Sequence, residues 1–584
     1  MKKYFIETLA QRKFVVPMLI LAIMIAAFAV RIYKHEDWLY FKMDQARDAM
    51  LISKAIADPG YLPLLGPRAG ATTLESGFLR LGPVYYYFQY LAALIAHSTE
   101  PYVMAYPDLF FSLAAIALVY FFSRLYFSQK HALMIMAMYA FSFIIIQYSR
   151  FAWNPNSLQF FLLLTFFGLL KFINEEDAKK KKWWIALWTF ALAIGSQLHF
   201  FGFFSLLGIS GLVILYSLKP WSKESWKKYF QKTTLLNFSK YFAIVTIIFV
   251  FIYAPVIISD VFEKGQNANN FIEALGSKPT NKPLIEKIGK NLEENLNYYC
   301  LITTSDCYAG DLGDNTGSVL VTGLILMAGL FLSVWNFIKI KDEKKRNFLV
   351  LLMIWIGVFF ILTIPISFQL RPRFFIVVFA VPFIFLGLLF EFLENRYGKK
   401  MFFVALLVTM AIIISNMYGT YAWFSEQSAS QNSRIKVKRT LILKAKDGVT
   451  LGELQRVADF IYIKHKEGAN IYYYVKPEHE RPIQYLLEEK HDPNFNFSTL
   501  KINKDPNAQY FAIVPDKKDG LDSVGDKYKL DFDVLSREKV GQLLVAEINF
   551  PTRAVSAEFK VKKDSGSEDR LFWKDVFGTK VNVK

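Results

Sequence analysis

Residues 14–30 read FVVPMLILAIMIAAFAV, an uninterrupted apolar run that follows Lys2, Lys3, Arg12 and Lys13. Basic residues followed by apolar ones are typical of a signal peptide, but this run is longer than the apolar part of one. It approaches the length of about 20 residues that a helix needs to cross a bilayer. Because many similar runs follow along the chain, we predict a first membrane helix that stays attached to the protein.

The composition of the 584-residue chain is that of a polytopic membrane protein. Hydrophobic residues make up 54% of the chain, 56 residues are Phe, and the apolar residues recur in runs of bilayer length. A formal net charge of +18 would suggest a nucleic-acid partner in a soluble protein. Here the Lys and Arg residues lie largely between the apolar runs, where they set orientation and meet anionic lipid. We therefore expect membrane lipids and no nucleic acid as partners.

The chain has only two cysteines, Cys300 and Cys307. So small a number provides neither a disulfide framework nor a cysteine-rich metal site. The two residues would pair if their loop faces an oxidising compartment, and two free thiols are an equal alternative.

The distribution of basic residues decides which of twelve apolar runs cross the membrane. If all twelve crossed, with the N-terminus in the cytoplasm, the basic clusters around 179–182, 223–228 and 341–346 would lie outside, against the positive-inside rule. Leaving out residues 83–97 returns all three clusters to the cytoplasm. That run is short, begins with Gly-Pro and is rich in tyrosine, so we predict a helix on or dipping into the outer leaflet. The eleven predicted spans are 14–33, 104–127, 131–148, 157–173, 183–199, 200–218, 240–258, 317–338, 347–366, 374–393 and 400–418.

The sequence predicts two domains. Residues 1–418 form a helical membrane module with long outer loops at 34–103 and 259–316. From residue 419 the long apolar runs stop and short β-rich pieces, such as NIYYYV (470–475), alternate with helical ones. We therefore expect 419–584 to be a soluble α/β domain on the outer face. We expect the protein to lie in the plasma membrane of a bacterium, with its N-terminus in the cytoplasm.

The first outer loop contains FKMDQARDAMLISKAIADPG, residues 41–60. Asp44 can cap the helix that residues 45–57 would form. On that helix Asp44, Arg47 and Asp48 lie on one side, because their spacings are three and four residues. A helix cap with a local ion pair and a carboxylate that does chemistry at the membrane surface are both consistent with this pattern.

Basic residues at the predicted outer face are unexpected under the same charge rule. Arg371 and Arg373, in RPRFF, begin a membrane helix there, and guanidinium groups bind phosphate in a bidentate way. Snorkelling to lipid headgroups is the alternative. Arg150 lies in the outer loop SRFAWNPNS, next to Asn154, and His199 ends the helix that carries GSQLH.

The order of these motifs resembles the GT-C superfamily of membrane glycosyltransferases. The nearest branch resembles the protein O-mannosyltransferases and the lipid A aminoarabinose transferases (glycosyltransferase families 39 and 83). MDQARDAMLISKAI resembles the family's acidic first loop, GPVYYYFQYLAAL its Pro-aromatic stretch with Tyr85, and RPRFFIVVFAVPFIFLGLL its Arg-aromatic helix start. The resemblance covers about residues 10–420.

The resemblance implies a sugar donor on polyprenyl phosphate and a lipid, glycan or protein acceptor. It makes Asp44 the catalytic carboxylate and Asp48 its supporting partner or the alternative base. Residues implied to bind substrate are Arg371, Arg373, Arg150, His199, Asn154 and Tyr85. The family often has a second acidic residue before proline in the second outer loop, where this chain has Asn154 and Pro155. An amide is a weak metal ligand, so we predict no metal-binding residues, while a role for Mg²⁺ or Mn²⁺ stays open.

The expected function is transfer of a sugar from a polyprenyl-phosphate donor on the extracytoplasmic face. A single base with no enzyme nucleophile predicts inversion at the anomeric carbon, by analogy with inverting hydrolases. A flippase or transporter of lipid-linked saccharides and a noncatalytic membrane scaffold are the alternatives. A transporter would place ionisable residues near mid-membrane, whereas here the charges gather at the outer helix ends and loops.

Overall fold

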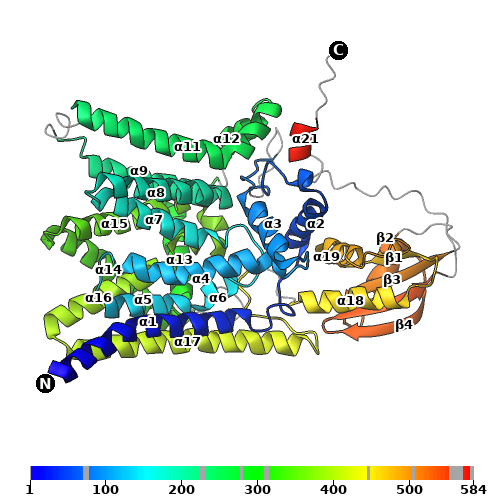
Figure 1. Cartoon of the computed structure of the whole chain (residues 1–584). Helices are drawn as coiled ribbons and strands as arrows, with labels where there is room; N and C mark the ends of the chain where they lie inside the picture. The colour runs from blue at the N-terminus through cyan, green and yellow to red at the C-terminus, as the bar shows by residue number, and fades with distance from the viewer. Residues whose placement is uncertain are drawn as a thin grey trace, which may run out of the picture.

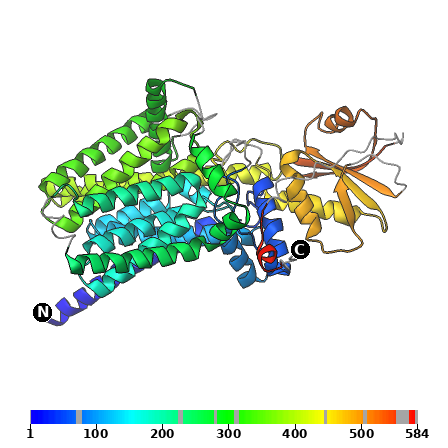
Figure 2. The same ribbon diagram turned by 90° about the horizontal axis from the view of Figure 1, so that it is seen from above.

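The long helices run side by side, and an α/β region projects from one end of their bundle (Figures 1 and 2). The structure is a computed structural model. It describes residues 2–69, 78–222, 231–276, 281–307, 315–442, 448–500, 507–550 and 570–578.

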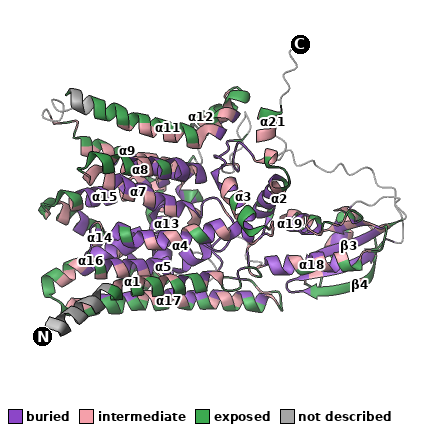
Figure 3. Ribbon diagram, viewed as in Figure 1, coloured by how far each residue is buried: buried purple, intermediate pink, exposed green. Residues whose placement is uncertain are grey.

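Seven helices within the described residues are long and apolar enough to cross a membrane. An eighth span is formed if η4 (Pro372–Val378) and α16 (Val381–Tyr397), which are bent by 41°, are counted together. Much of the apolar surface of α1 and α11 is exposed, as Figure 3 shows, and only lipid can cover such surface. The seven helices are α1 (Lys2–Ile32), α4 (Tyr106–Ser123), α9 (Phe200–Leu218), α11 (Lys232–Phe262), α14 (Thr316–Lys339), α15 (Glu343–Thr363) and α17 (Lys400–Ser430).

The other three predicted spans are helices that do not meet this criterion on their own. The run 131–148 is divided into α5 (Gln129–Ala140) and α6 (Phe143–Tyr148). The run 157–173 is α7 (Leu158–Asn174), which is slightly too short. The run 183–199 is part of α8 (Ala178–Leu198), whose first turn contains the tetralysine 179–182. Helices α7 and α8 pack closely together. The eleven predicted spans therefore correspond to seven or eight clear ones plus these interior helices.

Helix α3 (Val84–Ala96) is the run predicted not to span. Its 13 residues extend about 20 Å, less than the hydrocarbon core of about 30 Å. Together with α2 (Met43–Ala57) it lies at the end of the bundle that faces the α/β region (Figure 1).

Two of the three basic loops meet at the opposite end of the bundle, and the third, 223–228, lies outside the described residues. Lys219, after α9, has its Nζ 3.7 Å from Glu343, which begins α15. Asn347 of α15 donates to Asn174 at the end of α7, at 2.7 Å. The tetralysine that follows Asn174 therefore lies at this end too, which agrees with the predicted grouping of basic loops on one side.

The α/β region begins after α17, which continues to Ser430, beyond the predicted boundary at residue 418. Its helices are α18 (Leu451–Lys464), α19 (Pro477–Glu488) and α20 (Asp522–Tyr528). Its strands are β1 (Asn470–Tyr474), β2 (Asn496–Thr499), β3 (Ala508–Pro515), β4 (Asp533–Val540) and β5 (Leu543–Asn549). The sheet order is β2-β1-β3-β5-β4, with β1 parallel to β2 and β3, and β5 antiparallel to β3 and β4. The predicted mixture of strands and helices is confirmed.

Helix α19 attaches this region to the membrane module by packing against α2. The Tyr485 hydroxyl donates to the Thr99 carbonyl at 2.5 Å, and Ser53 of α2 donates to Glu489 at 3.2 Å. The amide of Leu451, at the start of α18, donates to the Leu39 carbonyl at 3.0 Å. Contacts from two of its helices therefore fix the α/β region beside α2.

Cys300 and Cys307 form a disulfide at the end of α13 (Leu284–Thr303). Their Cα atoms are 5.6 Å apart, within the usual range for a disulfide. The sequence left open whether the two cysteines pair or stay free, and in the structure they are paired.

The docking of α19 on α2 is expected to weaken in acid because of His479. Burial first, and then the charges of Lys42 and Lys476, hold the pKa of His479 well below its usual value of 6.5. Below pH 6.5 the unfolded chain therefore binds a proton that the folded protein does not. The free energy of unfolding then falls by about 1.4 kcal/mol for each unit by which the pH is lowered. Glu478, whose Oε1 is 3.6 Å from Nε2, offsets part of this loss.

Thermal unfolding of the full chain between pH 5 and 7.5 measures the effect. The His479→Gln variant should show a flatter pH dependence, and the exposed His491→Gln should keep that of the original protein. Equal slopes for all three proteins would show that His479 does not control this stability.

Candidate active site

The two aspartates of the first loop lie in the first turns of α2. The amide of Lys42 donates to the Gln45 side chain at 3.2 Å, so Gln45 provides the capping contact at the helix start. Asp44 is the second residue of the helix and does not cap it, which corrects the predicted cap role. A carboxylate in the first turn is still stabilised by the helix dipole.

Arg47 joins the two carboxylates. Its Nη1 donates to Asp44 Oδ1 at 3.0 Å, and its Nε and Nη2 donate to Asp48 Oδ1 at 2.9 and 2.8 Å. The Tyr86 hydroxyl from α3 donates to the same Asp48 oxygen at 3.0 Å. The prediction that Arg47 is a local partner of the two aspartates is confirmed.

The two carboxylates differ in environment. The Asp44 side chain is 60% exposed, whereas that of Asp48 is 6% exposed. Burial raises the pKa of Asp48, although the charge of Arg47 opposes this. Asp44 is therefore the carboxylate that a substrate can reach. The buried Asp48 holds the Arg47 side chain in place.

Arg373 lies near this pair, although it comes from η4, far along the chain. Its charge interacts with that of Asp44. Its guanidinium carbon is 5.4 Å from the ring centroids of both Trp153 and Phe374. Its Nε is buried and has no hydrogen-bond partner among the described residues. Arg371, two residues earlier, is exposed.

His199 adjoins Arg373. Its ring meets Phe374 edge-on, with the centroids 5.6 Å apart. Its Nδ1 atom is buried and has no hydrogen-bond partner among the described residues. The structure thus places His199 against Phe374 and beside Arg373, while Asp44 is close enough for its charge to act on Arg373.

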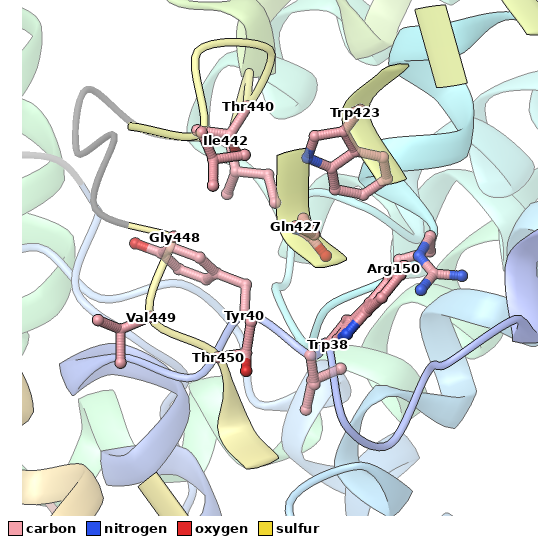
Figure 4. A pocket seen from close by; sticks show the side chains of 12 residues that line it. Trp38, Tyr40, Arg150, Trp423, Gln427, Thr440, Ile442, Gly448, Val449 and Thr450 are labelled. Carbon is pink, nitrogen blue, oxygen red and sulfur yellow. The ribbon is translucent and has the colours of Figure 1, made fainter. Parts of the chain in front are cut away.

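Arg150 is engaged elsewhere. Its Nη1 donates to the Val30 and Arg31 carbonyls at 3.1 and 2.5 Å, and its Nη2 donates to the Tyr33 carbonyl at 2.6 Å. These bonds satisfy the free carbonyls at the end of α1. The side chain lines a separate pocket with Trp38, Tyr40 and Trp423 (Figure 4). The geometry indicates a helix-capping role for Arg150 instead of the predicted phosphate contact.

Tyr85 and Asn154 also hold the structure together. The buried Tyr85 hydroxyl donates to Asp108 at 2.7 Å, and Asp108 also accepts from the Trp153 amide at 2.9 Å and the Ser157 hydroxyl at 2.6 Å. The Asn154 amide donates to the Leu198 carbonyl, next to His199. These contacts fix the loop that presents Trp153 to Arg373, so the two residues predicted to bind substrate act here as supports.

A close pairing of two loop segments completes this end of the module. The Gly66 amide donates to the Leu81 carbonyl at 2.7 Å. The backbones of Arg68 and Arg80 form an isolated antiparallel β-bridge between the two segments. A Cβ atom on Gly66 would lie 2.1 Å from the Gly82 carbonyl oxygen. Only glycine permits this approach of two backbones.

The Gly66→Ala variant is therefore expected to lose about 1–3 kcal/mol of stability, because a backbone clash cannot be relieved by a side-chain movement. The Gly289→Ala variant in α13 is a matched control, since a Cβ atom there meets nothing within 4 Å. It should gain about 0.5–1 kcal/mol from helix propensity. Thermal unfolding measures both changes, and a Gly66→Ala protein as stable as the original would contradict the close approach.

No three His, Cys, Asp or Glu side chains gather as a metal site would require, in the part of the chain that the structure describes. The two carboxylates of the candidate site, Asp44 and Asp48, both accept hydrogen bonds from Arg47.

Comparison with known proteins identifies the architecture. Residues 71–262 match the family model described as dolichyl-phosphate-mannose-protein mannosyltransferase. The structure is similar to that of ArnT from Cupriavidus metallidurans in the apo state, with a TM-score of 0.53, 12% identity, and coverage of 94% of this chain and 100% of that chain. The predicted resemblance to the GT-C membrane glycosyltransferases is confirmed. The structure of ArnT from the same organism bound to undecaprenyl phosphate gives a TM-score of 0.52 and 12% identity, with coverage of 92% of this chain and 99% of that chain. No curated protein matches the chain in sequence.

The family match covers a middle part of the membrane module. The matched residues include α3 and continue to the end of α11. Asp44 and Asp48 precede the match, and Arg371 and Arg373 follow it. The likeness of fold to ArnT covers 94% of this chain and so extends beyond the matched residues.

Sequence reasoning missed several residues around the aspartate pair and the loop that carries Trp153. Tyr86 is one of three consecutive tyrosines, and the sequence does not say which of them meets a carboxylate. Asp108 had a usable signal, because an acidic residue at the start of an apolar run is a candidate functional or supporting group. Arg80 and Arg570, which lie beside Tyr86, occur in segments without a recognisable pattern.

Proposed function

We propose that this chain is a membrane glycosyltransferase that transfers a sugar from a polyprenyl-phosphate donor to an acceptor. Transfer takes place at the end of the bundle that carries α2, which the positive-inside rule assigns to the extracytoplasmic face. The family match and the GT-C fold support the class of reaction. The ArnT structure with bound undecaprenyl phosphate supports a lipid phosphate as the donor carrier.

The observation that carries the proposal is an accessible carboxylate beside an arginine with a free buried donor. Asp44 is held by Arg47 but remains exposed, and its charge interacts with that of Arg373. A sugar phosphate placed between them would offer its anomeric carbon to an acceptor at Asp44 and its phosphate to Arg373. This arrangement matches the two requirements of the reaction, a base for the acceptor and a cation for the leaving group.

In this mechanism Asp44 takes the proton of the acceptor as the acceptor oxygen or nitrogen attacks the anomeric carbon. The bond from that carbon to the phosphate oxygen breaks, and the electron pair leaves with the polyprenyl phosphate. No enzyme nucleophile takes part, so the anomeric configuration inverts. Asp48 does not exchange protons with substrate, because it is buried and bound by Arg47 and Tyr86.

The phosphate is held by Arg373, with Arg371 at the entrance. The rings of Trp153 and Phe374 keep the Arg373 guanidinium in place and exclude water around it. An ionic hydrogen bond is stronger in such a setting than in bulk water. The buried Nδ1 of His199, which has no hydrogen-bond partner among the described residues, can donate to the same phosphate.

The test uses the full chain in nanodiscs with undecaprenyl phosphate that carries a labelled sugar, together with a membrane extract as the source of acceptor. Formation of undecaprenyl phosphate and labelled product is expected, with inversion visible by NMR. The corresponding nucleotide sugar should give no product. Movement of intact donor across the bilayer without cleavage would show a transporter, and the absence of both would leave the scaffold.

A further inference from the structure

The last described segment of the chain, residues 570–578, lies beside the first loop (Figures 1 and 2). The Leu64 amide donates to the Leu571 carbonyl at 3.0 Å, and the Trp573 amide donates to the Leu62 carbonyl at 3.1 Å. The indole of Trp573 donates to the Tyr87 hydroxyl at 3.0 Å. These contacts attach the segment to the loop between α2 and α3.

This attachment inserts Arg570 beside the aspartate pair. The residue is 6% exposed, and its guanidinium carbon lies 5.6 Å from the ring centroid of Tyr86. The same tyrosine donates to Asp48. The Arg570 Nε and Nη1 atoms are buried and have no hydrogen-bond partner among the described residues. A buried guanidinium with two open donors is costly unless an acceptor binds there.

The surroundings of Arg570 are positively charged. Burial first, and then the charges of Arg570, Arg68 and Arg47, lower the pKa of Arg80 to about 10. Among the described residues, the Asp48 carboxylate beside Tyr86 is already bound by Arg47. The guanidinium groups of Arg47, Arg68, Arg80 and Arg570 repel one another here, and an anion would reduce this repulsion.

We propose that the segment 570–578 delivers Arg570 to a phosphate-binding site on the Tyr86 side of the aspartate pair, which it shares with Arg80. The ligand is a phosphate group, because guanidinium groups bind tetrahedral oxyanions through two parallel hydrogen bonds. The proposal rests on the proposed function in that the phosphate belongs to one of the two substrates. The C-terminal segment is then part of the active site and not only an attachment.

Binding to the full chain in nanodiscs tests this site without any need for transfer. The probes are undecaprenyl phosphate, added to the lipid, and inorganic phosphate, added to the solution. The Arg570→Met variant, which keeps the bulk of the side chain, should bind one of the probes about 10- to 100-fold more weakly than the original protein. A loss confined to undecaprenyl phosphate assigns the site to the donor. A loss for inorganic phosphate with unchanged lipid binding assigns it to a phosphorylated acceptor.

Two further variants separate binding from folding. Lys574→Ala removes another cation from the same segment, one that lies 3.6 Å from the Tyr61 ring centroid, and should change affinity less than about twofold. Trp573→Ala should release the segment, weaken binding to a similar degree as Arg570→Met, and expose the Leu64 amide to hydrogen exchange. The Leu64 amide should stay protected in Arg570→Met.

Unchanged affinity of Arg570→Met for both probes, with the Leu64 amide still protected, would overturn the proposal. This result is distinct from failure of the proposed function, which would appear as no cleavage of donor by the original protein. The Arg570 variants measure phosphate binding and the original protein measures donor cleavage, so each result can be obtained whatever the other shows.

Discussion

Replacement of Asp44 with asparagine is expected to lower the rate of sugar transfer by about 10²- to 10⁴-fold, the usual contribution of a general base. The amide has the shape of the carboxylate but cannot take the proton of the acceptor. Folding should be preserved, because the Asp44–Arg47 ion pair is exposed on one side and such pairs contribute about 0–1 kcal/mol. Donor affinity should change little, since the proposed mechanism places the acceptor and not the phosphate at Asp44. The measurement is the rate of undecaprenyl phosphate release at saturating donor.

Two variants serve as controls for this result. Asp37→Asn removes a nearby exposed carboxylate that pairs with Lys34 at 3.5 Å, and it should transfer at the original rate. Asp48→Asn should lower thermal stability, because it leaves Arg47 without its buried partner. A stable Asp44→Asn protein that transfers sugar as fast as the original would exclude Asp44 as the base.

The second large effect is expected for Arg373→Ala, which should weaken donor binding by about 10- to 100-fold. A charged hydrogen bond to phosphate contributes about 1.5–3 kcal/mol, and Arg373 has a buried Nε ready to make one. Binding of undecaprenyl phosphate measures the loss directly. Arg373→Lys should recover part of the affinity, because an ammonium group keeps the charge but not the bidentate geometry.

The control for Arg373→Ala is Arg396→Ala, at the other end of the same bent span, where the arginine is exposed. It should bind undecaprenyl phosphate normally. If Arg373→Ala and Asp44→Asn lost donor binding equally, both residues would have a binding role and the base would have to be sought elsewhere. Unchanged binding in Arg373→Ala would remove the arginine from the phosphate site.

The spacing of charged residues predicted the local part of the site. On α2, residues three and four apart lie on one face of any helix, so Asp44, Arg47 and Asp48 had to meet. The sequence could not rank the two aspartates by accessibility. That difference depends on the packing of other segments against α2, among them Tyr86 of α3, which donates to the buried Asp48.

Arg150, Asn154 and Tyr85 show where local reasoning ends. Each is polar, lies near the predicted outer face, and looks free in the sequence. In the structure each one satisfies a group from another part of the chain, namely the carbonyls at the end of α1, the Leu198 carbonyl, and Asp108. Buried polar groups must find partners, and the partner depends on which helices become neighbours.

The sequence alone determined that the chain is a membrane protein, which helix ends share a side, and that an α/β region follows the last span. These features depend on the length of apolar runs, on basic loops and on local periodicity, all of which are properties of neighbouring residues. Only the tertiary structure decided that the charge of Asp44 acts on Arg373, that His199 lies beside Arg373, and that Arg570 reaches Tyr86 from the far end of the chain. Such contacts are set by the packing of whole helices and loops, because the free energy that brings distant residues together is spread over the entire interface.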